Sequence, residues 1–215
     1  MKKLVIFDLD GTLLNTYADI AAATNHALRL RGYPEHSVAV IKSFVGNGIN
    51  KLFERALPEG HKHEFLEIRR DFIPFYNEHG TELTFVFDGM TELLEKIQSE
   101  NIKIGVASNK YEEATKHLMK HFFPTINFTA VIGQREGIPT KPDPGIVFEI
   151  MKTAKVEDSS EVLYIGDSEV DMQTAKNAGV DVIGVSWGCK TREQLESHSP
   201  LTVVDKANEI NGFIC

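Results

Sequence analysis

Short runs of branched apolar residues recur along this chain and constrain its fold more than any other feature. They occupy residues 4–7, 102–107, 130–133, 162–166, 181–186 and 201–204. Each run is nearly continuous rather than alternating, which is typical of strands that are buried on both faces of a sheet. Segments with a helical spacing of apolar residues lie between most of the runs. Because strands that alternate with helices form parallel sheets, we predict an α/β fold with a doubly wound parallel sheet.

Helix ends are recognisable between these runs. Residues 88–101 place four apolar side chains on one face, which predicts an amphipathic helix. Asp143 is expected to cap another helix, with Pro144 at its first position, because proline needs no hydrogen-bond donor there. A third helix is expected to end at Gly179, since glycine readily adopts the left-handed conformation that closes many helices.

One interval breaks the alternation. Between residues 7 and 102 no further run of strand type occurs, although an ordinary crossover is far shorter. Helical patterns fill most of this interval, and a structureless loop of that length would be unusual. We therefore predict a helical cap domain over residues 15–83, inserted after the first strand into a core domain formed by residues 1–14 and 84–215.

Composition restricts the partners and the location. The formal net charge of −8 argues against nucleic acid or a membrane surface as a partner, because both attract clustered Lys and Arg. Cys189 and Cys215 are the two cysteines, so no disulfide framework is expected. The apolar start breaks at Asp8, too early for a signal peptide, and no segment is long enough to span a bilayer. We expect a cytoplasmic protein, monomeric or weakly dimeric, for which small anions remain possible partners.

Two acids follow the first apolar run, where a buried carboxylate is costly unless a cation or a proton neutralises it. Asp8 and Asp10 stand two residues apart, so on an extended chain both side chains point to the same side. Ser108 and Asn109 follow the second run, and Asp167 follows the fourth. Because the carboxyl ends of parallel strands share one edge of a sheet, these groups are expected to converge.

A lysine and a further acid complete the set. Lys141 precedes Pro-Asp-Pro after the third run, and Asp171 stands one helical turn beyond Asp167. Carboxylates, a hydroxyl and a lysine suit Mg2+ with a phosphate, since Mg2+ prefers few carboxylates together with waters and phosphate oxygens. Each of these residues also has an interpretation without function. The first acid pair is also typical of a turn after a strand, and the Ser-Asn pair of a helix cap. Lys141 would then be a solvated loop lysine, and Asp171 an exposed acid in the first turn of a helix.

The order of these motifs resembles that of the haloacid dehalogenase-like (HAD) hydrolase superfamily. Its four motifs are similar to DLDGT, SN, the lysine of KPDP, and GDSEVD, in this order along the whole chain. The resemblance implies a Rossmann-like core with an inserted helical cap, and a phosphohydrolase that uses Mg2+. The stretch SFVGNGINKLFERAL also resembles the cap loop of phosphoglycolate phosphatase-like members, although Gly46-Asn47-Gly48 is equally typical of a turn between helices.

The resemblance further implies a role for each acid. Asp8 would be the nucleophile that forms an aspartyl-phosphate, and Asp10 the acid and base for the leaving alcohol and the attacking water. Asp8, the carbonyl of Asp10 and Asp167 would hold Mg2+, while Asp171 would orient a metal-bound water or Lys141. Lys141 would also balance the charge on Asp8 and on the phosphate.

The resemblance places a second group of residues around the phosphate: Gly11, Thr12, Ser108, Asn109 and Lys141. Dehalogenation and phosphonate cleavage are disfavoured, because neither reaction needs Asp10. A sugar-phosphate mutase of the β-phosphoglucomutase type shares most of the motifs, but such mutases usually carry a hydrophobic residue where Thr12 stands.

These features together predict a Mg2+-dependent phosphatase for a small phosphate monoester, with 2-phosphoglycolate as the leading substrate. The alternatives are the mutase, a pyrophosphatase or nucleotidase of the same superfamily, and a non-enzymatic binding module. The last of these would lack at least one catalytic group, whereas here the whole set is present.

Overall fold

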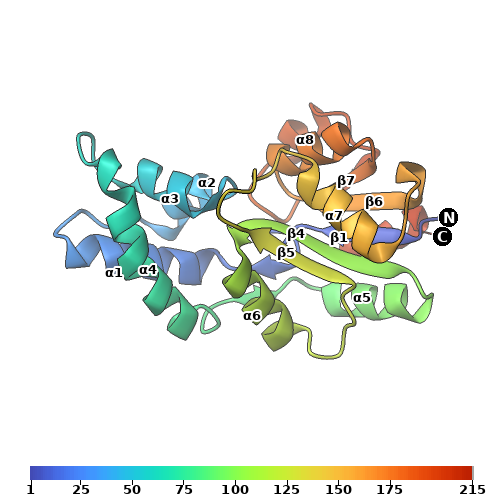
Figure 1. Ribbon diagram of the computed structural model, residues 1–215, viewed down its shortest axis with the longest axis horizontal. Coiled ribbons are helices and arrows are strands. Elements are labelled where there is room, and N and C mark those ends of the chain that lie inside the picture. The colour runs from blue at the N-terminus through green and yellow to red at the C-terminus, as the bar shows by residue number, and fades with distance from the viewer. Residues whose placement is uncertain (215) are drawn as a thin grey trace.

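A six-stranded sheet forms the centre of the fold, in the order β5-β4-β1-β6-β7-β8 with parallel pairing throughout (Figure 1). The structure is a computed structural model that describes residues 1–214, and Cys215 lies outside the described residues. The strands of this sheet are β1 (Leu4–Phe7), β4 (Lys103–Tyr111), β5 (Ala130–Gln134), β6 (Val162–Gly166), β7 (Asp181–Val185) and β8 (Thr202–Val204). The predicted doubly wound parallel sheet is confirmed.

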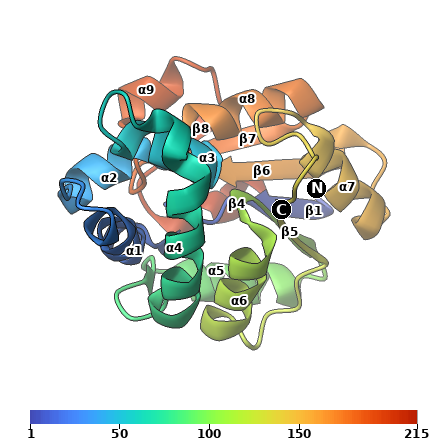
Figure 2. The same cartoon turned by 60° about the vertical axis from the view of Figure 1, so that its left-hand side comes forward.

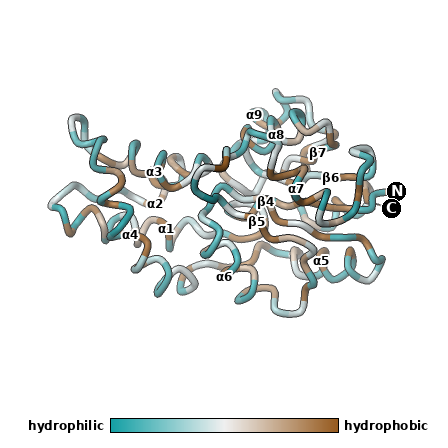
Figure 3. Tube along the Cα trace, in the orientation of Figure 1, coloured by the Kyte–Doolittle hydropathy of each residue, from teal (hydrophilic) through white to brown (hydrophobic). Residues whose placement is uncertain are grey.

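Helices cover both faces of this sheet. They are α5 (Met90–Ser99), α6 (Glu112–Phe122), α7 (Gly145–Ala154), α8 (Glu169–Ala178) and α9 (Arg192–Glu196), with 3-10 turns at Ser159–Glu161 and Ala207–Phe213. Val5 and Phe7 of β1 pack on the face covered by α5 and α6, whereas Leu4 and Ile6 pack on the face covered by α7, α8 and α9. All four side chains are buried, which explains the unbroken apolar run. Figure 3 shows hydrophobic residues along these central strands.

A second group of helices lies beside the sheet, at the end of the molecule away from the termini (Figures 1 and 2). Its members are α1 (Tyr17–Leu30), α2 (Val38–Phe44), α3 (Gly48–Ala56) and α4 (Phe65–His79), with a 3-10 turn at Lys62–Glu64. They pack around a hydrophobic cluster distinct from the two clusters of the sheet, in which the rings of Phe53 and Phe72 meet edge to face at 5.4 Å. This separate cluster supports the proposal of a helical insert over residues 15–83.

Two short strands stand where the chain enters and leaves these helices. β2 (Leu14–Asn15) pairs antiparallel with β3 (Phe85–Val86), so the two crossings lie side by side. The prediction that no strand occurs between residues 7 and 102 is therefore wrong. A ladder of two residues is too short to produce a period that the sequence would show.

Element ends differ from the prediction at two places near the sheet edge. β4 continues past Ala107 to Tyr111, with its register to β5 interrupted between these residues. Helix α7 begins at Gly145 instead of Pro144, and Asp143 accepts a hydrogen bond from the Gly145 N–H at 2.8 Å. Gly179 caps the C-terminus of α8 in the left-handed conformation, as predicted.

Within residues 1–214, no helix combines the length and the apolar character that crossing a membrane requires. Cys189, the cysteine that the structure describes, carries a free thiol.

The carboxylate of Asp19 ties the segment that returns to the sheet onto α1. Its oxygens accept hydrogen bonds from the Leu83 N–H at 3.0 Å and the Thr84 N–H at 2.8 Å. The Thr84 hydroxyl donates a further bond to Asp19 at 2.7 Å. Asp19 and Thr84 are buried, so water cannot replace this acceptor without local opening.

Replacing Asp19 by alanine is expected to lower the free energy of unfolding by about 2–3 kcal/mol, because buried donors lose their acceptor. Urea denaturation followed by circular dichroism measures the change. Asp71→Ala is the matched control, since Asp71 pairs with Arg31 near the surface at 2.8 Å. Such a pair contributes at most about 1 kcal/mol. Equal losses in the two variants would contradict the role given to Asp19.

Candidate active site

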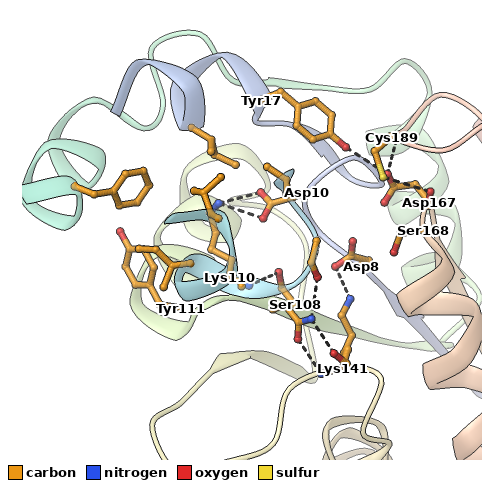
Figure 4. Close-up of a pocket in the computed structure, with 18 residues that line it drawn as sticks. Asp8, Asp10, Tyr17, Ser108, Lys110, Tyr111, Lys141, Asp167, Ser168 and Cys189 are labelled. Carbon is orange, nitrogen blue, oxygen red and sulfur yellow. Dashed lines mark hydrogen bonds and ion pairs between the residues drawn. The ribbon is translucent and has the colours of Figure 1, made fainter. Parts of the chain in front are cut away.

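A pocket lies between the carboxyl ends of the central strands and the helices α1, α3 and α4 (Figure 4). Its wall on the sheet side contains six of the predicted site residues: Asp8, Asp10, Ser108, Asn109, Lys141 and Asp167. These residues come from β1, β4, the loop before α7 and the end of β6. Parallel pairing brings them together, because every one of these strands ends at the same edge of the sheet.

Asp8 lies directly after β1 with its side chain almost fully buried. Its N–H extends the strand ladder by donating to the Ile165 carbonyl at 2.9 Å. Oδ1 accepts a hydrogen bond from Lys141 Nζ at 2.7 Å, whereas no described residue donates to Oδ2. Burial, followed by the charge of Asp171, raises the pKa of Asp8 well above its ordinary value, although Lys141 opposes the shift. One carboxylate oxygen is thus held and the other is available to a ligand.

Lys141 places an ammonium at the centre of the site. Its side chain is 2% exposed, and Nζ lies 2.7 Å from both Asp8 and Asp171. Nζ also contacts the Ala107 carbonyl at 2.9 Å and the Tyr164 hydroxyl at 3.1 Å. Burial acts to lower the pKa of Lys141, but the two carboxylates outweigh burial and raise it well above its ordinary value. The lysine therefore stays charged, with its three donors committed to the protein.

Asp171 makes contacts that orient Lys141. It is fully buried, and its Oδ1 accepts hydrogen bonds from Lys141 and, at 3.1 Å, from the Tyr164 hydroxyl. Oδ2 accepts the Ser168 hydroxyl at 2.6 Å and the Ser168 N–H at 3.1 Å, and this pair forms the capping box of α8. Both oxygens are therefore occupied. Of the two roles predicted for Asp171, orienting the lysine is the one that these contacts support.

Asp167 lies at the end of β6, and it is 1% exposed. Oδ1 accepts the Thr12 hydroxyl at 3.2 Å, while Oδ2 accepts the Cys189 N–H at 2.6 Å. The Tyr17 hydroxyl donates a further bond to Oδ2 at 3.3 Å. Burial, together with the charge of Asp171, raises the pKa of Asp167 to about 6. Hydrogen bonds alone therefore do not compensate the burial of this acid.

The three buried acids leave an excess of negative charge. Oxygens of Asp8, Asp167 and Asp171 lie within 4.8 Å of one another, and Lys141 contacts two of these acids. The raised pKa values of Asp8 and Asp167 have this crowding as a cause besides burial. A cation that prefers oxygen ligands would relieve it. Since both oxygens of Asp171 are taken, Asp8 and Asp167 are the acids suited to bind a metal ion.

Asp10 meets a second lysine at the pocket wall. Its carboxylate oxygens lie 3.0 and 3.2 Å from Lys110 Nζ, and the Thr16 hydroxyl donates to Oδ1 at 2.6 Å. Lys110 Nζ also lies 4.6 Å from the centroid of the Tyr76 ring. Sequence reasoning gave Lys110 no role. Its position directly after the Ser-Asn pair, at the end of a central strand, was the available signal.

Ser108 and Asn109 differ in what they offer to a ligand. Ser108 Oγ accepts the Lys110 N–H at 3.1 Å, and among the described residues its own proton has no acceptor. The Asn109 side chain is committed to the protein: Nδ2 donates to the Gly46 carbonyl at 2.9 Å and to the Lys141 carbonyl at 3.1 Å. Its Oδ1 accepts the Lys141 N–H at 2.9 Å. Asn109 therefore links the loop before α3 to Lys141 instead of presenting its side-chain amide to phosphate.

Gly11 and Thr12, which are predicted to contact phosphate, are not among the described residues that line the pocket. The Gly11 N–H donates to the Leu14 carbonyl at 2.8 Å. Gly11 has a φ of +93°, and a Cβ there would lie 2.1 Å from the Tyr17 hydroxyl and 2.4 Å from Asp167 Oδ2. A side chain at position 11 would therefore clash with the Asp167 carboxylate, and the Thr12 hydroxyl donates a hydrogen bond to the same carboxylate.

Two further contacts at Asp167 were missed by sequence reasoning. Tyr17 opens α1, and Cys189 follows β7, so neither residue lies in a motif that had been recognised. Burial, and then the charge of Asp167, raises the pKa of the Cys189 thiol. The thiol therefore stays protonated and donates to the Asp167 main-chain carbonyl at 3.7 Å, while the Cys189 N–H donates to the Asp167 carboxylate. Only the folded chain shows that these two residues meet Asp167.

Comparisons with known proteins agree with the geometry. The family profile "Haloacid dehalogenase-like hydrolase" matches residues 5–185. A phosphoglycolate phosphatase of Cereibacter sphaeroides is 37% identical over 182 residues, which cover 82% of this chain and 81% of the relative. A phosphoglycolate phosphatase of Pseudomonas fluorescens is 31% identical over 215 residues, which cover 98% of this chain and 79% of the relative.

Solved structures show the same architecture. A protein from Lactobacillus delbrueckii subsp. bulgaricus matches with a TM-score of 0.89 and 33% identity over 100% of this chain and 99% of its own. A protein from Haemophilus somnus matches with a TM-score of 0.90 and 25% identity over 100% of this chain and 98% of its own. The chain therefore belongs to the haloacid dehalogenase-like hydrolase family. Within that family it is a phosphoric monoester hydrolase.

The crowding at Asp167 predicts how the stability of the metal-free protein depends on pH. Its pKa of about 6 exceeds the ordinary 3.8, so between these values the folded state binds more protons than the unfolded state. Asp167 therefore contributes its full share to the free energy of unfolding below pH 3.8, the ordinary pKa. This contribution is lost as the pH rises through about 6, the pKa in the folded protein. Relative to wild type, Asp167→Asn is expected to gain up to about 3 kcal/mol between about pH 4 and about pH 7.5.

Urea unfolding in the presence of a chelator, at several pH values, measures this difference. Asp88→Asn is the control, because Asp88 is exposed and lies outside the pocket. A difference between wild type and Asp167→Asn that stays constant across the range would show that charge crowding at this residue is absent.

Proposed function

We propose that the protein is a Mg2+-dependent phosphatase that hydrolyses a small phosphate monoester through an aspartyl-phosphate. The observation that carries this proposal is the meeting of Asp8, Asp10, Lys141 and Asp167 at one pocket, with an oxygen of Asp8 left unpartnered by the described residues. The relatives named as phosphatases support the same reaction class.

Phosphoryl transfer would begin at Asp8. Its Oδ2 attacks phosphorus, the bond from phosphorus to the ester oxygen breaks, and that oxygen takes a proton from Asp10. Lys141 holds Oδ1 of Asp8 at 2.7 Å and offsets negative charge on the transferred group. The Ser108 hydroxyl, whose proton has no acceptor among the described residues, donates to a phosphoryl oxygen.

Hydrolysis of the aspartyl-phosphate would use the same residues in reverse. A water attacks phosphorus, Asp10 accepts its proton, and the bond from phosphorus to Asp8 breaks, which releases inorganic phosphate and restores both acids. Lys110 and Thr16 hold the Asp10 carboxylate at the pocket wall through the whole cycle. These two contacts would keep Asp10 directed at the ester oxygen.

Mg2+ would be held by Asp8, Asp167 and the main-chain carbonyl of Asp10. Such an ion, when bound, supplies positive charge to the phosphate oxygens and to the crowded acids. The contribution of the chain is to keep Asp167 in place through Thr12, Tyr17 and Cys189. It also keeps Lys141 charged beside Asp8 through Asp171.

The pocket suits a compact leaving group. Its volume of about 60 Å³ has room for only a handful of water-sized groups. The wall contributed by the helices is largely apolar: its side chains are those of Ile20, Val45, Ile49, Leu52 and Phe72, together with Tyr17. We propose 2-phosphoglycolate as the substrate, because it is small and because relatives covering most of this chain carry that activity in their names.

The same apolar wall distinguishes a phosphatase from a sugar-phosphate mutase. A hexose has several hydroxyl groups that give up water on binding and need hydrogen-bond partners in the pocket. The helical wall offers aliphatic and aromatic side chains at that place. A nucleotidase would in addition need space for a base and a ribose. These features favour the phosphatase over both alternatives.

Replacing Asp8 by asparagine is expected to abolish phosphate release from p-nitrophenyl phosphate, because an amide cannot attack phosphorus. Release by the wild type is expected to require Mg2+. Asp10→Asn is expected to slow turnover by roughly 10²- to 10⁴-fold, the usual share of general acid–base catalysis. p-Nitrophenol leaves without help, so this variant still forms the aspartyl-phosphate and accumulates it.

Mass spectrometry of acid-quenched protein measures the adduct, with Asp88→Asn as the control. Turnover retained in Asp8→Asn would remove this residue as the nucleophile. Normal turnover in Asp10→Asn would remove the acid and base role.

Incubation with β-glucose 1-phosphate tests the mutase alternative. No glucose 6-phosphate is expected, because the largely apolar helical wall leaves most of the sugar hydroxyls without hydrogen-bond partners. Phosphorus NMR follows both sugar phosphates and inorganic phosphate in one sample, and 2-phosphoglycolate serves as the positive control for phosphate release. Conversion to glucose 6-phosphate at a rate comparable with hydrolysis of 2-phosphoglycolate would establish the mutase instead.

A further inference from the structure

The pocket contains a second ammonium group, that of Lys110. The reaction proposed above does not require this group to contact the substrate. Of the described residues that line the pocket, Lys110 and Lys141 are the two that carry an ammonium. Lys141 divides its donors among Asp8, Asp171 and neighbouring oxygens. Lys110 contacts a single acid, Asp10, at 3.0 and 3.2 Å. An ammonium has three donors, so Lys110 retains the capacity to bind a further anion.

Lys110 is also held so that its charge acts inside the pocket. Its side chain is 6% exposed, and Nζ lies over the Tyr76 ring at 4.6 Å from the centroid. The ring and Asp10 fix the ammonium from two sides, which removes most of the conformational freedom that a surface lysine has. Screening by water is weak at such a position, so a bound anion would interact strongly with this charge. Figure 4 shows Lys110 and Asp10 facing each other at the pocket wall.

Among the described residues that line the pocket, the helical side contributes no cation; Lys42 Nζ lies outside the lining, 4.9 Å from the centroid of the Tyr17 ring. Lys51 pairs with Glu54 at 2.6 Å on the exposed side of α3. Arg55 donates to the Phe44 carbonyl and to Asn47 Oδ1, both at 2.7 Å and both exposed. Neither cation lines the pocket. A second negative group on the substrate would therefore meet either the apolar wall or Lys110.

The contact between Lys110 and Asp10 restricts where that negative group can be. In the proposed reaction Asp10 protonates the ester oxygen, so Lys110 lies beside the atoms bonded to that oxygen. A carboxylate on the carbon next to the ester oxygen reaches Lys110 without leaving this wall. A carboxylate farther along the leaving group would be driven among apolar side chains, where its charge has no partner.

We propose that Lys110 is a specificity-determining residue that binds a carboxylate adjacent to the phosphate ester, and so selects 2-phospho-carboxylic acids. The proposal rests on the phosphatase function only in the placement of the ester oxygen at Asp10. It assigns the recognition of the leaving group to a residue of β4.

Binding of two unreactive analogues tests this proposal without turnover. 3-Phosphonopropanoate replaces the ester oxygen of 2-phosphoglycolate by a methylene group, and propylphosphonate is its counterpart without the carboxylate. Calorimetry with Mg2+ present gives the ratio of the two dissociation constants. Wild type is expected to prefer 3-phosphonopropanoate, and Lys110→Met is expected to reduce that preference roughly 10- to 100-fold, the usual effect of a buried charge-assisted hydrogen bond.

Two further variants make the result specific. Lys51→Met is the matched control on the exposed side of α3 and is expected to keep the wild-type preference. Lys110→Arg keeps the positive charge and is expected to retain most of the preference, and thermal unfolding verifies that each variant is folded. A preference unchanged in Lys110→Met would overturn the proposal. An equal loss of affinity for both analogues would also overturn it, because Lys110 would then act only by placing Asp10.

Hydrolysis of 2-phosphoglycolate is assayed separately with the same proteins. Wild-type protein that fails to hydrolyse the ester, yet shows a preference that depends on Lys110, would remove the proposed phosphatase activity and leave the carboxylate site standing. If the protein hydrolyses 2-phosphoglycolate but its preference for 3-phosphonopropanoate is the same in Lys110→Met, the phosphatase activity stands and the carboxylate site is removed.

Discussion

The buried ammonium of Lys141 between Asp8 and Asp171 is the interaction on which the remainder of the site depends. It joins the end of β1 to the loop before α7 and to the first turn of α8, and each of its two acids lies 2.7 Å away. Burying such groups is costly, and the shared ammonium offsets part of that cost for both acids. The cluster still contains more carboxylates than cations, since Asp167 lies close by. That imbalance supports the proposal that the site binds a divalent cation and, through it, a phosphate.

The two parts of the pocket divide the remaining work. The edge of the sheet supplies acids, lysines and a hydroxyl, while the helices α1, α3 and α4 supply an apolar wall. Asn109 connects the two parts. Its side chain donates to the Gly46 carbonyl and to the Lys141 carbonyl, and it accepts a hydrogen bond from the Lys141 N–H. A movement of the loop before α3 would therefore displace the Asn109 side chain and, with it, the backbone of Lys141. Excluding water from such a pocket strengthens the electrostatic interactions within it.

Much of the fold follows from local pattern. Unbroken apolar runs predicted the parallel strands, because a strand covered on both faces cannot alternate, and Gly179 ends α8 for the reason that the sequence suggested. The predictions from sequence that failed concern short strands and the ends of helices. The ladder of β2 with β3 has two residues in each strand and leaves no period. Helix α7 begins one residue late because Asp143 bonds the Gly145 N–H, and α2 begins at Val38 after a cap by Ser37 that sequence reasoning had not identified.

The sequence by itself determined which polar residues meet on the sheet side: acids and polar groups that stand directly after buried parallel strands reach the same edge of the sheet. Only the tertiary structure decided how these groups share their hydrogen bonds. It turned Gly11 and Thr12 toward Asp167 instead of the pocket, engaged the Asn109 side chain with the protein, and brought Lys110 to Asp10. The physical reason is that strand periodicity is local, whereas a buried charge is paired by neighbours that come from distant parts of the chain.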